Sequence, residues 1–198
     1  MKRLALALAT ALLLPALAQA FSLEQLAAQL GKPTVVRGEF VQQKFLRALE
    51  KPLTSRGQFV LAKQHGLLWL LKTPLQQDYR IDDQGIARRE AGGWQALPQR
   101  SASAQQNRLF LAVLGGDSSG LQRDFELALK GDAKDWQLTL TPRALLLKQI
   151  FTSIRIDGGA LVQRIVLDET QGDRTELQLQ NSIAADALSD QEQHDFAD

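Results

Sequence analysis

Alternation of apolar and polar residues with a period of two runs through much of the sequence and predicts β-strands. The clearest example is 174–182, where Leu177 and Leu179 alternate with glutamate and glutamines. Similar segments follow one another between residues 34 and 98 and again between 125 and 182, separated by turn signals such as DDQG. Among the strands predicted in this way are QDYRID at 77–82, FELALKG at 125–131 and KQIFTSIRID at 148–157. About nine or ten antiparallel strands are therefore predicted.

Two segments have the helical spacing of apolar residues instead. The first, 22–31, lies between a serine that can cap a helix and a glycine that can end one. The second, 101–117, carries Leu109, Phe110 and Val113 before a Gly-Gly stop signal. One helix at the front and another between two groups of strands predict an α+β fold whose sheet curls around a core.

The stretch LLWLL at 67–71 interrupts the alternation because it is apolar on both faces. One face can pack on the protein's own core, and the other needs a different cover. Carrying the period of two from 59–62 through this stretch assigns the residues to faces. One face has Phe59, Leu61, Leu67 and Trp69, and the other has Val60, Ala62, Leu68 and Leu70.

Residues 1–20 are predicted to be a secretory signal peptide. The basic pair Lys2-Arg3 precedes an apolar run, and Ala18-Gln19-Ala20 is a small-residue cleavage site. The apolar run is too short for a membrane span, which needs about 20 residues. The rest divides into a domain at 21–185 and an acidic segment at 186–198, which has few apolar anchors and is predicted to be a frayed tail.

The charge balance and the cysteine content restrict the cellular compartments and the binding partners that are possible for this protein. Without the two basic residues of the signal peptide, 21 basic side chains face 22 acidic ones, against 23 and 22 in the whole sequence. This balance offers no footprint for nucleic acid and no attraction to an anionic membrane surface. The chain has no cysteine, which excludes a lipid-modified N-terminal cysteine. Together with the signal peptide, this predicts a periplasmic protein.

Two motifs suggest chemistry, and neither has the context that the chemistry needs. GDSSG at 116–120 matches the G-x-S-x-G elbow of hydrolases, but a predicted helix precedes it where that motif requires a strand. His65 and His194 are far apart in sequence and have no cysteine to complete a zinc or copper site. The sequence therefore predicts neither an enzyme nor a bound metal or cofactor.

The order of several motifs resembles a known family. A short helix is followed by VVRGEFVQQKF and GQFVLAKQHGLLW, then much later by DWQLTLTPR and IVLDETQGDRTELQLQN. This order is similar to that of the periplasmic outer-membrane lipoprotein carriers, the LolA-type family, over nearly the whole chain after residue 20. The residues in step with the family's motifs are Phe40, Gln42, Gly57, Leu67, Trp69, Trp136 and Pro142.

The resemblance implies an unclosed half-barrel, which is a strongly curved antiparallel sheet lidded by helices over an apolar cavity. It implies a monomeric carrier that shields the acyl chains of a lipoprotein or other lipid-linked cargo. Its partners would be an inner-membrane donor complex and an outer-membrane acceptor. The residues expected to line the cavity are Phe40, Phe59, Leu61, Leu67 and Trp69 of the sheet and Leu109, Phe110 and Val113 of the lid.

Some features differ from the family's pattern. Lys63 stands where the family has an arginine that latches the sheet to the lid, so Lys63 is the latch candidate here. A lysine keeps the charge but lacks the planar fork of donors. Two alternatives to a carrier stay open: a lipid-sensing module that regulates a partner, and an enzyme of unrecognised type. Release of lipid to an acceptor membrane separates a carrier from a sensor.

Overall fold

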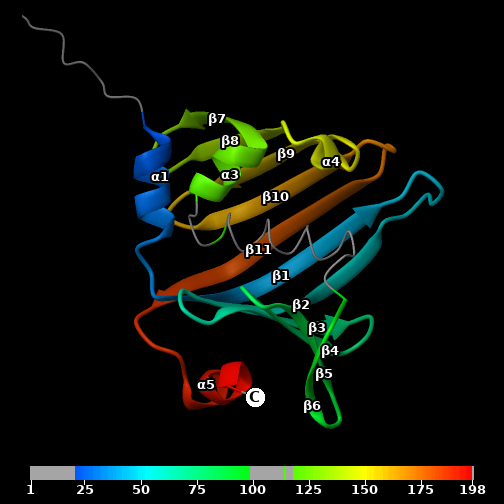
Figure 1. The fold of residues 1–198 in the computed structure, drawn as a ribbon, viewed down its shortest axis with the longest axis vertical. Helices are drawn as coiled ribbons and strands as arrows, with labels where there is room; N and C mark the ends of the chain where they lie inside the picture. The colour runs from blue at the N-terminus through cyan, green and yellow to red at the C-terminus, as the bar shows by residue number, and fades with distance from the viewer. Residues whose placement is uncertain (1–20, 99–113, 115–117, 198) are drawn as a thin grey trace, which may run out of the picture.

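The described residues of the protein, 21–98, 114 and 118–197 of a computed structural model, form an antiparallel sheet of eleven strands with short helices on both faces (Figure 1). The first six strands are β1 (Val35–Phe45), β2 (Leu53–Ala62), β3 (Gly66–Thr73), β4 (Gln77–Asp82), β5 (Gly85–Glu90) and β6 (Gly93–Ala96). The other five are β7 (Phe125–Gly131), β8 (Trp136–Pro142), β9 (Phe151–Gly158), β10 (Val162–Glu169) and β11 (Arg174–Ala185). The helices are α1 (Leu23–Leu30), α3 (Ser118–Asp124), α4 (Leu145–Lys148) and α5 (Asp190–Ala197).

The strand order is β6-β5-β4-β3-β2-β1-β11-β10-β9-β8-β7. Consecutive strands pair with each other, and the pair of β1 with β11 joins the two halves of the chain. The edge strands β6 and β7 lie at opposite ends of this order, so the sheet stays open as it curves (Figure 1). The predicted α+β fold with an unclosed, curved antiparallel sheet is confirmed, with slightly more strands than expected.

Helix α1 forms where its capping residues predict it. The Ser22 hydroxyl accepts a hydrogen bond from the Gln25 backbone N–H at 3.2 Å, and the Gln25 side chain accepts one from the Ser22 N–H at 2.9 Å. This reciprocal pair satisfies two of the donors that every helix start leaves unpaired. Leu26 and Leu30 lie one turn apart and are both buried against the sheet. The apolar stripe therefore fixes which side of α1 meets the strands.

The two faces of the sheet carry separate apolar clusters. Phe59, Leu67 and Trp69 belong to the cluster on which α1 and α3 pack, and we call this side the inner face. Val60 and Leu68 belong to the other cluster, on which α5 packs, and we call this side the outer face. Alternation along β3 therefore places successive apolar residues of the LLWLL stretch on opposite faces of the sheet, in two different apolar clusters. Leu61 packs with the inner cluster, and Ala62 and Leu70 pack with the outer one.

The acidic C-terminal segment is a helix docked on the sheet, which corrects the predicted frayed tail. Phe196 of α5 is 7% exposed and packs in the outer cluster with Leu68. Leu188, in the connection from β11, packs against the same cluster. These two apolar residues are the few anchors that the segment has. They suffice because β2 and β3 present a matching apolar surface to them.

Arginines on the strands pair with the acidic residues of α5. Arg37 of β1 donates two hydrogen bonds to the Glu192 carboxylate, at 2.8 and 2.7 Å. Arg89 of β5 donates to Asp195 at 2.6 Å, and the Trp94 indole N–H donates to the Asp195 carbonyl oxygen at 3.0 Å. Fork-shaped pairs of this kind are both stronger and more directional than a single charged contact. The acidic composition of the segment is therefore matched by cations from distant strands.

Away from α5, the outer face is a solvated network of ion pairs. On β10 and β11, Glu176 accepts hydrogen bonds from Arg164 at 2.9 Å and from Arg174 at 3.2 Å. The Arg164 hydrogen bond lowers the pKa of Glu176 below its ordinary value. The outer face thus divides into an apolar half under α5 and a charged half exposed to water.

Two local predictions need correction or lie outside the structure. A strand was predicted to start at residue 148, but Leu145–Lys148 form the one-turn helix α4, and β9 begins at Phe151. The predicted helix at 101–117 lies outside the described residues except for Leu114, which is helical and buried. In the part of the chain that the structure describes, we find no helix long and apolar enough to cross a membrane.

The docking of α5 predicts a pH-dependent stability. Burial would raise the pKa of Glu192, but hydrogen bonds from Arg37 and from the Ser189 backbone outweigh burial and lower it. A carboxylate with a lowered folded-state pKa stabilises the fold above its unfolded-state pKa, and this stability is lost as the pH falls through the folded-state pKa. We expect Glu192→Gln to lower the free energy of unfolding by about 1 kcal/mol at pH 7, and the difference from wild type to vanish in acid.

Urea unfolding between pH 3 and pH 7 measures this difference. Glu50→Gln is the matched control, because Glu50 is exposed and has no ion pair within the described residues. A Glu192→Gln penalty that stays constant across the pH range would contradict the prediction.

Candidate functional site

Three aromatic side chains from the neighbouring strands β1, β2 and β3 form the centre of the inner face. Phe40 of β1 and Trp69 of β3 stack with their ring centroids 3.7 Å apart and their planes at 18°. Phe59 of β2, which lies directly opposite Trp69, has its ring centroid 6.5 Å from that of the indole. All three are at most 8% exposed. The period of two in β1, β2 and β3 brings these rings to one side of the sheet.

Two glycines on neighbouring strands leave the space that the Phe40 and Phe59 rings occupy. Gly57 lies opposite Phe40 in the β1–β2 pair, and Gly38 lies opposite Phe59. A Cβ atom at position 57 would lie 2.7 Å from the Phe40 ring, and one at position 38 would lie 2.9 Å from the Phe59 ring. Each phenylalanine therefore leans over a glycine of the neighbouring strand. Because Phe40 leans over β2 in this way, it can reach Trp69 on β3.

The apolar surface continues from this aromatic centre across the rest of the sheet. Buried side chains of the same cluster come from every strand between β11 and β7, for example Leu177, Ile165, Ile156, Leu138 and Phe125. Thr175 is the one polar residue that is buried among the described residues. A continuous apolar face of this width is suited to contact with another apolar surface.

The cover of the inner face is also apolar. Leu26 and Leu30 of α1, Leu121 of α3 and Leu114 all pack in the same cluster as the aromatic centre. Among the described contacts, Gln29 of α1 adds a hydrogen bond of 2.6 Å to the carbonyl oxygen of Gly159. The contact between the sheet and these helices is therefore mainly dispersion and water exclusion.

The structure brings together most of the residues predicted to line a cavity. Phe40, Phe59, Leu67 and Trp69 are buried in one cluster, and Leu61 is half-buried against it. Leu109, Phe110 and Val113 of the predicted lid lie outside the described residues. Leu71 and Tyr79 also pack against this cluster and were not among the residues predicted from the sequence, although Leu71 has the same parity along β3 as Trp69. The role of Gly38 needed the strand register, which no local pattern shows.

Lys63 lies in the turn between β2 and β3 and is exposed. Its backbone N–H donates to the Thr34 carbonyl oxygen at 3.1 Å. Within the described residues its ammonium group has no ion pair. The lid to which the family's arginine is latched corresponds to residues outside the described ones, so the latch stays a prediction.

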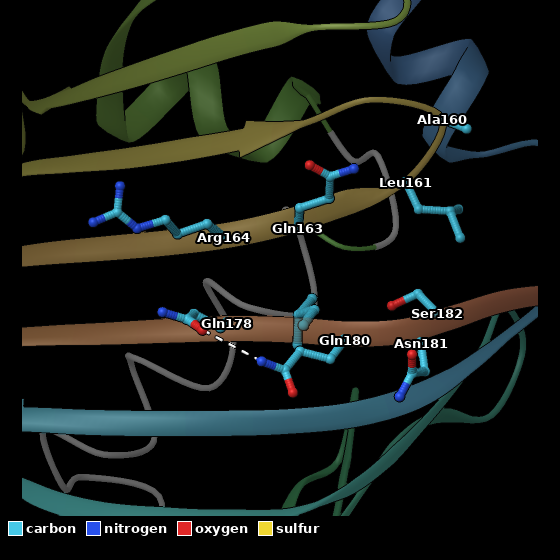
Figure 2. Close-up of a pocket in the computed structure, with 9 residues that line it drawn as sticks. Ala160, Leu161, Gln163, Arg164, Gln178, Gln180, Asn181 and Ser182 are labelled. Carbon is cyan, nitrogen blue, oxygen red and sulfur yellow. Dashed lines mark hydrogen bonds between the residues drawn. The ribbon is translucent and has the colours of Figure 1, made fainter.

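A hollow lies on the outer face between β10 and β11, and its lining is more polar than the inner face (Figure 2). Gln163, Arg164, Gln178, Gln180 and Asn181 line much of it, and the Gln180 amide donates to Gln178 at 3.4 Å. Its walls present amides and a guanidinium, which acyl chains would desolvate without compensation. This groove is therefore a poor site for hydrocarbon. No group of three potential metal ligands is found in the described part of the chain.

The chain belongs to the LolA-like family of outer membrane lipoprotein carrier proteins, whose family model matches residues 15–195. Proteins of this family are binding and carrier proteins of the periplasm. No curated protein matches the chain.

Three solved structures that match the chain are distant from it in sequence. A LolA superfamily protein from Nitrosomonas europaea is 9% identical over 87% of this chain and 97% of its own, with a TM-score of 0.52. The MucA/MucB complex of Pseudomonas aeruginosa matches 86% of this chain and 58% of that chain at 17% identity, with a TM-score of 0.49. LprF from Mycobacterium bovis matches 86% of this chain and 98% of its own at 13% identity, with a TM-score of 0.40. The first of these supports the fold and nothing beyond it.

The packing of Phe40 over Gly57 predicts a large effect of one added methyl group. Gly57→Ala places a Cβ atom against both the Phe40 ring and the Leu70 carbonyl oxygen, so we expect it to lower the free energy of unfolding by about 1–3 kcal/mol. The near-ultraviolet circular dichroism of the stacked Trp69 should weaken as well. Gly92→Ala is the control, because a Cβ atom there meets nothing within 4 Å. Equal stabilities of the two variants would show that the Phe40–Trp69 stack does not depend on Gly57.

Proposed function

We propose that the protein is a periplasmic carrier that shields the acyl chains of a lipoprotein or another lipid-linked cargo on the way from the inner to the outer membrane. The observation that supports this most is the inner face, an apolar surface that extends across an unclosed sheet and is covered by helices. Membership of the LolA-like family supports the same class of cargo.

The cargo site we propose is the aromatic centre and its surroundings: Phe40, Phe59, Leu61, Leu67 and Trp69. In the described form these side chains belong to one apolar cluster with the leucines of α1 and α3. Acyl chains would reach them after the cover moves away from the sheet. Each CH₂ group transferred from water contributes about 0.8 kcal/mol, so even one chain would offset the loss of several leucine contacts. Exchange of one apolar partner for another keeps the inner face dry in both states.

A matched pair of leucines tests whether the inner face holds the cargo. Leu61 and Leu70 are both half-buried on adjacent strands, but Leu61 faces the inner cluster and Leu70 the outer one. We expect Leu61→Asn to weaken binding of a fluorescent fatty acid about tenfold, which corresponds to roughly 1.4 kcal/mol. Leu70→Asn should leave the affinity unchanged. A loss of affinity confined to Leu70→Asn would place the site on the outer face and contradict the proposal.

Delivery separates a carrier from a lipid-sensing module. Protein loaded with a fluorescent acyl-peptide is mixed with acceptor vesicles, and transfer is followed by the loss of fluorescence at the protein. A carrier should release its cargo to the vesicles, whereas a sensor should retain it. Retention by a protein that binds the probe tightly would favour regulation of a partner over transport.

As a second part of the proposal, Lys63 holds the closed form through a single ammonium group. A charged hydrogen bond contributes roughly 1.5–3 kcal/mol at most, and an arginine could form two. Lys63→Arg should then favour the closed form and slow the entry of an apolar probe in stopped-flow mixing, with Lys32→Arg as a control. Changes below about twofold, or ~0.4 kcal/mol, for both Lys63→Arg and Lys63→Ala would mark an ordinary surface lysine.

A further inference from the structure

Most of the large apolar side chains that are exposed in the described part of the chain stand on three connections between strands. They are Phe45, Leu49 and Leu53 around the β1–β2 connection, Leu75 between β3 and β4, and Leu145 and Leu146 between β8 and β9. We call these six residues the leucine rim. Ile183 near the end of β11 is the other large apolar residue exposed there.

The topology brings the three connections to one end of the sheet. Along the strand order, direction reverses at every step, so β1, β3 and β8 all run the same way. Each of these strands leads into one of the three connections, whose positions follow the right-hand edge of the sheet in Figure 1. Ile183 lies toward the opposite end, where β11 finishes. The rim is therefore a property of one end of the molecule rather than a scatter over its surface.

The rim leucines are exposed to an unusual degree for residues in a folded protein. Leu75 and Leu145 are 75% and 76% exposed, and Leu146 is 65% exposed. Single exposed leucines are common and need no explanation. Three turns that each present apolar side chains at the same end are a different pattern, because any of the turns could carry polar residues without cost to the core.

Each apolar connection also carries a lysine. Lys51 precedes Leu53, Lys72 precedes the turn of Leu75, and Lys148 follows Leu146 by two residues. All three are exposed, and none forms an ion pair with another described residue. Three other cations nearby have partners. Lys44 pairs with Glu169 at 3.8 Å, Arg143 pairs with Glu126 at 3.9 Å, and Arg47 donates a hydrogen bond to the Gln171 carbonyl oxygen at 3.2 Å. Glu50 is the acidic residue in these connections.

We propose that the leucine rim docks the protein on the surface of a lipid bilayer with anionic headgroups. The apolar tips enter the interface between headgroups and acyl chains, and the three lysines extend their ammonium groups to the phosphates. The near-zero net charge of the whole chain does not oppose this, because the attraction acts within about a Debye length of the surface. Docking through the rim is independent of which cargo the inner face holds.

The arrangement favours a bilayer over a protein partner. A protein interface has a contiguous, close-packed apolar core, whereas the rim presents its side chains on separate turns with polar backbone between them. A fluid interface accepts each tip individually and needs no complementary shape. Interfacial anchors combine modest apolar burial with basic residues in this manner.

Vesicle flotation tests the proposal with the exported, processed protein. Vesicles of phosphatidylethanolamine and phosphatidylglycerol in a 3:1 ratio are compared with phosphatidylcholine vesicles. We expect the wild-type protein to float with the anionic vesicles, and the combined change Leu49→Ser, Leu75→Ser and Leu146→Ser to lower its partition at least tenfold. Ile183→Ser removes an exposed apolar residue at the other end and should have no effect.

The lysines have a matched control of equal charge. Lys51→Glu, Lys72→Glu and Lys148→Glu together should abolish the preference for anionic vesicles. Lys32→Glu, Lys130→Glu and Lys134→Glu change the net charge by the same amount near the opposite end of the sheet and should preserve it. Binding of a soluble fluorescent fatty acid should be unchanged in every rim variant, which separates failure of the docking surface from failure of the cargo site.

Three results would overturn the proposal. The wild-type protein could fail to float with either kind of vesicle, which would show that the rim does not bind a bilayer and would favour a protein partner. The two triple-lysine variants could lose vesicle binding equally, which would show that only net charge matters. The rim variants could lose fatty-acid binding, which would assign these leucines to the cargo site instead.

Discussion

Strand β3 is buried on both of its faces, and this constraint explains why α5 covers the outer face. Leu67 and Leu68 are adjacent in sequence and both fully buried, so they need covers on opposite sides of the same strand. On the inner face, Leu67 belongs to the apolar cluster that also holds the buried leucines of α1 and α3. The outer face at Leu68 is covered by the last helix, α5. A sheet with a solvated outer face would need neither α5 nor the arginines that hold it.

The strands follow from local pattern, because alternation and turn residues act over a few positions. The segments predicted at 77–82 and 125–131 coincide with β4 and β7. The docking of α5 could not be predicted in this way. Its acidic residues resemble a solvated tail until Arg37 and Arg89 are known to face them, and those arginines precede α5 by more than a hundred residues.

The aromatic centre also could be predicted from the sequence only in part. Period-two alternation places Phe59 and Trp69 on one face, and the family resemblance adds Phe40. Phe40 can stack on Trp69, two strands away, because Gly57 lies opposite Phe40 and leaves space for its ring. Gly57 has this position in only one register of β1 and β2. A slip of one residue would put a bulky side chain in that place and move every apolar group to the other face. Register is a property of the assembled sheet, so the sequence alone could not supply it.

The two covers of the sheet are held by different forces, and this difference bears on function. Helix α5 is bound through directional contacts: the fork of Arg37 on Glu192, the Arg89–Asp195 pair, and hydrogen bonds from Arg80 and Trp94 to its last carbonyl oxygens. Such contacts are lost sharply when a helix shifts, because each depends on angle and distance. The helices on the inner face are held chiefly by apolar contacts, which another apolar partner can replace with little net change. A cover held by apolar contacts on one side and a fixed one on the other suits the carrier role that we propose.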